Sequence, residues 1–410
     1  MTRWIIFLVI VLAVEFYAFQ AIKNAFRIKW IAYGYEIISV LALLYVIWTF
    51  LQFDRHEGQT KLTLYSASIL LILSIPKTVL TLVLFGEDLV RLFNAVVHYF
   101  MHQESLEGHF PDRRRFVSQI ALGLAAIPFL SLIYGVFKGK YNFRVIKQAV
   151  FFEDLPDSFD NFTITHISDM HSGSLDNPEK IQYAVDLINE QNSDLVVFTG
   201  DIVNSLASEM TPWIDTFKGV HDAPFGKFSI LGNHDYGEYI IFDTKEEKRA
   251  NFEAIKGLHE KIGFELLLNE NRIFRRGSDS IALIGVENWG HRFRKAGDLN
   301  IASEGLKDTD FKILLSHDPS HWEIEVKEDP RKYHLTLSGH THGFQFGIEI
   351  PGIIKWSPVS YVYKQWAGLY EHMGSFIYVN RGLGFHGYSG RVGIWPEITV
   401  LKLKKKQKIS

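Results

Sequence analysis

The chain has 410 residues, no cysteine, a formal net charge of -3 and a hydrophobic fraction of 47 %. The lack of cysteine excludes disulfide frameworks, thiol nucleophiles and cysteine-ligated zinc or iron–sulfur sites. A net charge so close to zero argues against a basic nucleic-acid-binding protein. The length allows two or three domains.

Four apolar segments precede residue 140, and none of comparable length follows. Each is close to the roughly 20 residues that an α-helix needs to cross about 30 Å of hydrocarbon. No small-residue cleavage site follows the first segment, and Lys23, Arg27 and Lys29 come next, which argues against a removable signal peptide. We therefore predict a four-helix transmembrane domain over residues 1–140. Its spans are residues 4–22, 30–51, 62–85 and 116–137.

Three ionisable residues, Glu15, Glu36 and Lys77, interrupt these spans. If successive helices run antiparallel, the three side chains lie at a similar depth. Charged groups in hydrocarbon usually pair or face a polar cavity. Our hypothesis is that they form one polar cluster. The alternative is that each of them reaches the membrane surface separately.

An even number of spans places the N-terminus, the connection after the second span and everything after residue 140 on one side of the membrane. The cations that flank the spans are equally numerous on the two sides, so their distribution does not decide the orientation. The more basic C-terminal flank of the first span favours an extracytoplasmic soluble portion. We expect a multi-pass protein of the cell (inner) membrane.

From residue 141 onward, short apolar or β-branched runs alternate with amphipathic stretches, which is typical of an α/β domain. We predict that this domain covers residues 141–410. The expected strands are 143–152, 162–168, 194–199, 228–231, 280–286, 311–316 and 334–338, with β-rich sequence from there to residue 403. The expected helices are 246–262 and 178–189, the latter with Asn177 as its N-cap.

Five polar clusters follow the ends of predicted strands. Ligands of open α/β sheets collect beyond the carboxyl ends of the strands, so the clusters can converge on one crevice. Each cluster taken singly has an ordinary interpretation as a turn, a cap or a hydrogen-bonded core histidine. The clusters are Asp169-Met170-His171, Gly200-Asp201-Ile202-Val203-Asn204, Gly232-Asn233-His234-Asp235, Ser316-His317-Asp318 and Gly339-His340-Thr341-His342.

The order Asp-x-His, Gly-Asp-x-x-Asn, Gly-Asn-His-Asp, His, Gly-His-x-His resembles the calcineurin-like metallophosphoesterase superfamily. Residues 154–156, 162–164, 378–384 and 391–398 resemble its membrane-associated YkuE-like and YaeI-like branch. The resemblance covers about residues 141–403. It implies an α/β fold, a calcineurin-like αββα four-layer sandwich, preceded here by the four-helix transmembrane domain.

The resemblance also implies two divalent metal ions, for which Mn, Fe, Zn or Ni suit the ligands. One ion would have Asp169, His171, Asp201 and His342 as ligands. The other would share Asp201 and take Asn233, His317 and His340. His234 would then be catalytic, meeting the phosphoryl group. The family commonly has Asp where Asn204 stands, which leaves open whether His234 acts as an acid or as a neutral donor, and whether Asp235 replaces the missing carboxylate.

The implied reaction is hydrolysis of a phosphodiester, pyrophosphate or phosphomonoester by a metal-activated hydroxide. A membrane anchor favours a phosphorylated small molecule or lipid-linked substrate, and we expect no nucleic-acid partner. Two alternatives stay open: a sensor that binds a phosphorylated ligand without turnover, and a transporter with a regulatory soluble domain. Three further segments either line the crevice or only pack against the rest of the domain. They are residues 287–289, the Gly-rich residues 382–390 and the aromatic residues of 356–370.

Overall fold

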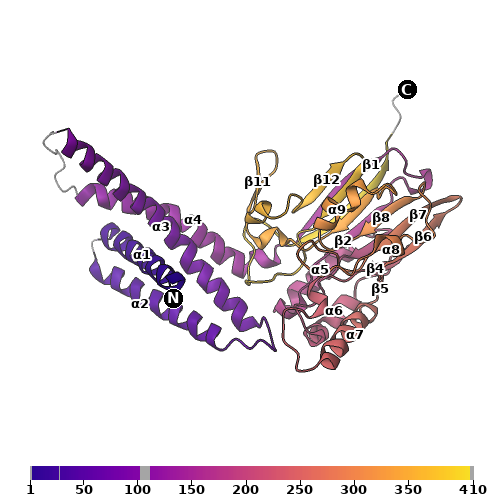
Figure 1. Cartoon of the computed structure of the whole chain (residues 1–410), viewed down its shortest axis with the longest axis horizontal. Coiled ribbons are helices and arrows are strands. Elements are labelled where there is room, and N and C mark those ends of the chain that lie inside the picture. Colours follow the sequence, from indigo (N-terminus) through magenta and orange to yellow (C-terminus); the bar gives the residue numbers. More distant parts are fainter. Residues whose placement is uncertain (1, 27, 102–110, 407–410) are drawn as a thin grey trace. The chain divides into compact units, whose positions relative to one another are not determined.

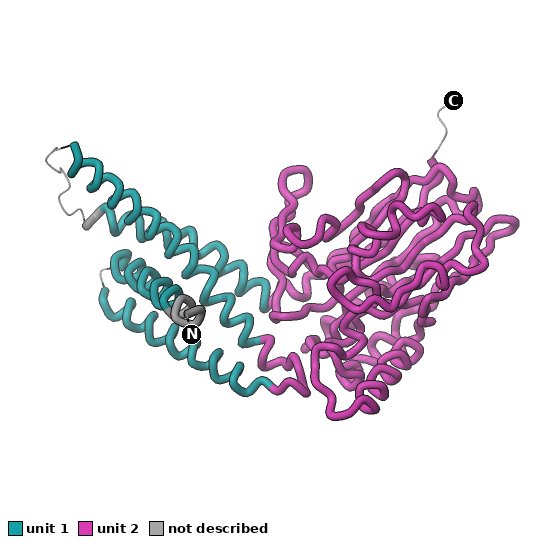
Figure 2. The backbone as a smooth tube through the Cα atoms, viewed as in Figure 1, with its two compact units in different colours: residues 1–53, 65–136 teal, residues 54–64, 137–410 magenta. Residues whose placement is uncertain are grey.

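The structure is a computed structural model that describes residues 2–26, 28–101 and 111–406. The chain divides into two compact units, as Figure 2 shows. Unit 1 comprises Met1–Phe53 and Tyr65–Val136, and unit 2 comprises Asp54–Leu64 and Phe137–Ser410. The connection formed by residues 54–64 therefore groups with the C-terminal unit. The domain division at residue 140 stays a prediction.

Unit 1 consists of long apolar helices (Figure 1). Within the described residues, three segments are long and apolar enough to cross a membrane, namely Lys29–Leu51, Lys61–Phe100 and Arg113–Phe137. Apolar side chains such as Leu41, Trp48 and Leu82 are exposed on the isolated chain, as lipid-facing residues are. The helices are α1 (Thr2–Ala25), α2 (Lys29–Leu51), α3 (Lys61–Phe100) and α4 (Pro111–Phe137).

Helix α3 is longer than its predicted span, which ended at residue 85. Its last turns carry Glu87, Asp88 and Arg91, and they stay helical. Hydropathy marks where lipid-compatible residues stop, whereas charged residues with good helix propensity continue the backbone helix beyond that point. The end of an apolar run is therefore a poor guide to the end of this helix.

Glu15 and Lys77 lie together, as the cluster hypothesis predicted. Lys77 Nζ donates to Glu15 Oε1 and to Ser39 Oγ, each over 2.5 Å, and Ser39 Oγ donates to Glu15 Oε2 over 3.2 Å. Glu36 interacts electrostatically with both Glu15 and Lys77, and its Oε2 is buried without a hydrogen-bond partner within the described residues. The three ionisable groups therefore form one polar cluster inside unit 1.

Replacing Lys77 by Met should strongly destabilise the protein. Lys77 is 5 % exposed, and its loss leaves the partly buried Glu15 carboxylate without its cation. Breaking a buried ion pair in this way costs about 3–5 kcal/mol. The measurement is thermal unfolding of the full chain in detergent, where a Glu15→Gln/Lys77→Met variant should recover most of the loss. Glu36→Gln is the matched control and should not destabilise, so equal losses for Lys77→Met and Glu36→Gln would contradict this prediction.

Unit 2 contains two six-stranded sheets. The first has the order β1-β14-β2-β3-β4-β5, with β2, β3, β4 and β5 parallel to one another. The carboxyl ends of β2, β3 and β4 consequently share one edge. The strands are β1 (Arg144–Phe152), β14 (Glu397–Lys405), β2 (Thr163–Ile167), β3 (Leu195–Phe198), β4 (Lys227–Ser229) and β5 (Glu265–Leu266).

The second sheet has the order β12-β13-β9-β8-β7-β6, in which β7, β8, β9 and β13 are parallel. The strands are β12 (Gly368–His372), β13 (Ser375–Val379), β9 (Leu335–Ser338), β8 (Phe311–Leu315), β7 (Asp279–Gly285) and β6 (Glu270–Arg276). A separate antiparallel pair joins β10 (Ile348–Ile350) to β11 (Ile354–Trp356).

Helices cover the outer faces of both sheets. One core, with Ile164, Leu195 and Ile313, fills the space between the sheets. A second core packs α5 and α7 on the first sheet, and a third packs α8 and α9 on the second. The expected αββα sandwich is confirmed, and Asn177 caps α5 by accepting from Lys180 N. The helices are α5 (Pro178–Asn189), α6 (Ile214–Lys218), α7 (Lys245–Lys261), α8 (Leu299–Ala302) and α9 (Ser320–Ile324).

Candidate metal centre

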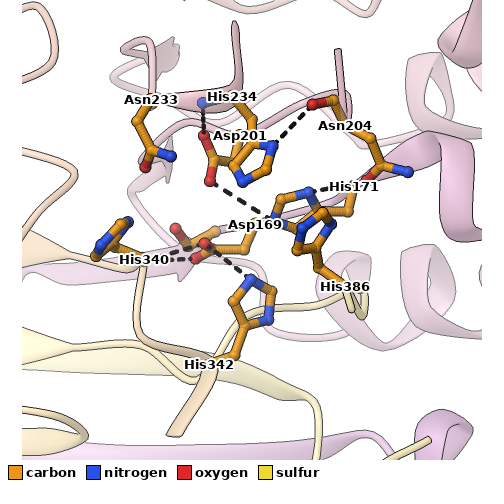
Figure 3. Close-up of polar contacts among 12 residues, drawn as sticks. Asp169, His171, Asp201, Asn204, Asn233, His234, His340, His342 and His386 are labelled. Atoms are coloured by element: carbon orange, nitrogen blue, oxygen red, sulfur yellow. Dashed lines mark hydrogen bonds and ion pairs between the residues drawn. The ribbon is translucent and has the colours of Figure 1, made fainter. Parts of the chain in front are cut away.

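The fold brings all eight predicted site residues together at the carboxyl ends of five strands. Figure 3 labels all of them except His317. All eight side chains are buried or nearly so. Each residue lies within seven positions of the end of its strand, so the rigid sheets position them. They are Asp169 and His171 after β2, Asp201 after β3, Asn233 and His234 after β4, His317 after β8, and His340 and His342 after β9.

Two groups of side chains present ligand atoms to a common point. Asp169, His171 and His342 form one group, and Asp201, His317 and His340 form the other, with all ligand atoms of a group within 4.8 Å of one another. Asp201 lies between the groups, because its Oδ2 is 3.6 Å from His171 Nε2 and 3.1 Å from His317 Nε2. The carboxylate of Asp201 can therefore contact an ion in either group.

Two buried acceptor atoms of the predicted ligands lack a donor within the described part of the chain. Among the described residues, Asn233 Oδ1 and His340 Nδ1 have no hydrogen-bond partner. The opposite end of each side chain is engaged, since Asn233 Nδ2 donates to Tyr239 Oη over 2.6 Å and His340 Nε2 lies 2.8 Å from Tyr363 Oη. Buried polar atoms are rarely left unpaired. Oxygen and imidazole donors arranged in this way fit divalent ions.

The outward hydrogen bonds of two histidines fix which nitrogen faces the centre. His317 Nδ1 is 2.6 Å from Thr199 O, and His171 Nδ1 is 3.0 Å from Asn204 Oδ1. Both oxygens can only accept, so each Nδ1 carries a proton and each Nε2 is the nitrogen that faces the centre. Such partners orient metal-binding imidazoles.

Without an ion, the charges of the centre compensate each other. Burial alone would lower the pKa of His317, but the Asp201 carboxylate beside it raises that pKa to about 10. Burial alone would raise the pKa of Asp201, but the positive charge of His317 has the larger effect and holds that pKa well below its usual value. An ion that binds here must displace the proton of His317, so metal affinity should rise with pH.

The backbone is strained at five of the predicted ligands. Asp169, His171, Asp201, His340 and His342 have φ values of 52°, 45°, 59°, 71° and 49°. Non-glycine residues avoid this left-handed region at a cost of roughly 1–2 kcal/mol each. Strain of this kind persists only where the surrounding structure enforces it, and it collects at functional sites.

Two motif glycines are required because neighbouring loops approach closely. A Cβ on Gly232 would lie 2.2 Å from Asp201 Oδ1. A Cβ on Gly339 would lie 1.9 Å from Ser168 Oγ and 2.2 Å from Asp169 Oδ2. The two glycines therefore leave room for the predicted carboxylate ligands.

His234 lies beside the two groups and contacts the backbone instead of a carboxylate. Its Nδ1 is 2.7 Å from Asn204 O, and its ring stacks on Tyr239 at 4.2 Å between centroids. Of the two alternatives left open for this position, replacement of the missing carboxylate by Asp235 is not what the structure shows. Asp235 instead accepts from the backbone N–H groups of Asp201, Ile202 and Gly232, which ties two site loops together.

The sequence motifs missed one histidine of the site. His386, within the Gly-rich residues 382–390, stacks on His171 at 4.8 Å between ring centroids. Tyr363, from the aromatic run, contacts His340 as described above. Glu287 and Asn288 hold a turn together, because Glu287 accepts from Tyr236 Oη and Asn288 Nδ2 donates to Arg294 O. The only local sequence signal for His386 is its position in residues 382–390, a segment rich in glycine and aromatic residues.

Comparison with known proteins agrees with this architecture. The calcineurin-like phosphoesterase family matches residues 162–344, and the transmembrane domain of calcineurin-like phosphoesterases matches residues 2–140. The metallophosphoesterase YkuE of Bacillus subtilis is 32 % identical over 256 residues, which cover 61 % of this chain and 82 % of YkuE. YkoQ of the same organism is 25 % identical over 285 residues, covering 68 % of this chain and 97 % of YkoQ.

A transmembrane protein with a metallophosphoesterase domain from Danio rerio is also similar. It is 30 % identical over 284 residues, and the match covers 67 % of this chain and 60 % of the fish protein. Taken with the five strand-end clusters and the apolar helices, these matches show that the chain belongs to the calcineurin-like phosphoesterase family and carries its transmembrane domain.

Proposed function

We propose that the protein is a membrane-anchored, two-metal phosphoesterase that hydrolyses a phosphodiester, pyrophosphate or phosphomonoester. The observation that carries this proposal is the position of Asp201 between two groups of buried, inward-facing ligand atoms. A carboxylate in this position can bridge two ions, which is the arrangement that phosphoryl-transfer centres need.

The proposed ligands of one ion are Asp169, His171, Asp201 and His342. Those of the other are Asp201, Asn233, His317 and His340. Mixed imidazole, carboxylate and amide donors favour Mn, Fe, Zn or Ni over Mg or Ca. When bound, such a pair of ions supplies activation of the nucleophile and polarisation of the phosphoryl oxygens.

His234 is the proposed catalytic residue. Its Nδ1 donates to the main-chain oxygen of Asn204, which holds the ring in place and opposes the lowering of its pKa by burial. A protonated His234 can then donate from Nε2 to the oxygen of the leaving group. The neighbouring ring of Tyr239 restricts the rotation of the imidazole. Asn204 therefore supports two histidines, His234 through its carbonyl and His171 through its side chain.

The substrate class follows from the membrane location. A phospholipid or a lipid-linked pyrophosphate would share the bilayer with the enzyme, so it is the substrate that we favour over a soluble phosphoester. We place the protein in the cell membrane with the phosphoesterase unit on the extracytoplasmic side. This part of the proposal rests on anchorage and on the flanking charges of the first helix.

The test is an activity screen of the purified full chain. After removal of metal with a chelator, activity towards bis(p-nitrophenyl) phosphate should be absent, and addition of Mn should restore it. Phospholipids and nucleotide-linked lipids should then be tested as candidate natural substrates. Metal binding without turnover of any phosphoester would favour the sensor. Movement of a solute across vesicles without hydrolysis would favour the transporter.

A further inference from the structure

The connection between α2 and α3 lies against the two-sheet unit near the candidate site. Arg55 O accepts from Ile241 N over 2.9 Å, in the segment that follows the His234 motif. A Cβ on Gly58 would lie 2.5 Å from Ile240 Cγ2, and Gly58 has a φ of 72°. The backbone of the connection is therefore packed closely on residues 240 and 241.

Gln59, the next residue of the connection, binds the loop that holds His386. Its Oε1 accepts from Gly387 N over 3.0 Å, which fixes the orientation of the amide. Its Nε2 then lies 3.2 Å from His386 Nδ1. An amide nitrogen can only donate, so Nδ1 of His386 accepts and the neutral ring carries its proton on Nε2.

His386 is held beside the residues proposed to act on the phosphoryl group. Its ring stacks on His171 and meets the edge of His234, with centroids 4.8 Å and 4.5 Å away (Figure 3). One nitrogen of each of these three rings lies within 4.8 Å of the others. Its backbone N donates to Gln345 Oε1, which fixes the loop from the opposite side.

The hydrogen bonds of His234 and His386 make the two rings complementary. His234 uses Nδ1 to donate to a carbonyl, so its Nε2 is an acceptor in the neutral form. His386 uses Nδ1 to accept, so its Nε2 is a donor. A tetrahedral phosphoryl group that meets both rings would find the Nε2–H donor of His386 beside His234, which donates from its own Nε2 when protonated.

Building on the proposed function, we propose that His386 is a further catalytic residue whose Nε2–H donates to a phosphoryl oxygen, and that Gln59 is the positioning residue that fixes this tautomer. The connection between two membrane helices then completes the active site. This is consistent with four crossings, which place residues 54–64 on the same side of the membrane as the two-sheet unit.

The experiment compares full-chain variants after metal loading. His386→Ala and Gln59→Leu should each lower kcat by about 10- to 100-fold with little change in KM and none in metal content. His386→Gln, which keeps an N–H donor, should retain more activity than His386→Ala. The double variant His386→Ala/Gln59→Leu should be no worse than His386→Ala alone. Glu57→Gln, an exposed position of the same connection, is the control and should match the original chain.

A second measurement does not depend on turnover. Binding of inorganic phosphate to the metal-loaded chain, followed by calorimetry, should weaken roughly 3- to 10-fold in both single variants. If the original chain hydrolyses nothing but this loss is seen, the assignment of His386 as a donor to a phosphoryl oxygen stands and the proposed function fails. Unchanged kcat and phosphate affinity in His386→Ala would overturn the assignment.

Two further results would also overturn the proposal. A fall in metal content in His386→Ala would make His386 a ligand of an ion instead of a donor to phosphate. If Gln59→Leu lowers kcat by the same factor in the His386→Ala background as in the original chain, then Gln59 only anchors the connection.

Discussion

Replacing Asp201 by Asn should abolish phosphoester hydrolysis and lower the metal content from about two ions per chain to one or none. Asp201 Oδ2 lies within 3.6 Å of His171 and 3.1 Å of His317, one from each ligand group. An amide is neutral and offers only one oxygen, so it cannot hold two cations close together. Metal content by elemental analysis and turnover of bis(p-nitrophenyl) phosphate are the two measurements.

Asp215→Asn is the matched control for this prediction. Asp215 is an exposed carboxylate on α6, so the same chemical change there should alter neither metal content nor rate. Circular dichroism of the Asp201→Asn variant should show that the sheets remain folded, because Asp235 still holds the site loops. Full activity with two bound ions in Asp201→Asn would exclude a bridging role.

Replacing His234 by Ala should leave metal content unchanged and lower kcat by about 10²- to 10⁴-fold. His234 lies beside the ligand groups, and its Nδ1 is engaged by the carbonyl of Asn204 and not by a carboxylate. The loss should therefore come from the missing proton donor. The measurement is steady-state kinetics with substrates that differ in their leaving groups. The loss of kcat should be smallest for the most acidic leaving group, because that group needs protonation least.

Added imidazole offers a check on this interpretation. It should partly restore turnover in His234→Ala, because removal of the ring leaves space beside Tyr239, which stacks on it in the original chain. It should have no such effect on Asp201→Asn. Turnover of His234→Ala equal to that of the original chain would remove His234 from the mechanism.

Much of the fold could be predicted because local patterns determine it. The apolar runs of β2, β3 and β8 end within one residue of the predicted positions, and Asn177 marks the start of α5. The predicted site residues also follow these strand ends, and parallel strands bring their carboxyl ends to one edge. The motifs therefore identified the residues that meet there.

Other features depend on contacts between distant parts of the chain. Gln59 and His386 are 327 positions apart, and neither lies in a motif that predicts its partner. The charged strand β6 (Glu270–Arg276) was missed because its alternation is weak, and it forms by pairing with β7 at the sheet edge. The backbone partners of Asp235 could not be predicted either, since a sequence does not show which way a side chain points from a tight turn.

The length of α3 exceeds what one crossing of a membrane requires. Its 40 residues extend about 60 Å along the axis, whereas the hydrocarbon layer is about 30 Å thick. Even a tilt of about 40°, at the limit for membrane helices, leaves this helix longer than the layer. The charged residues Glu87, Asp88 and Arg91, which follow the predicted apolar span, therefore belong to a part of the helix that the hydrocarbon layer need not contain.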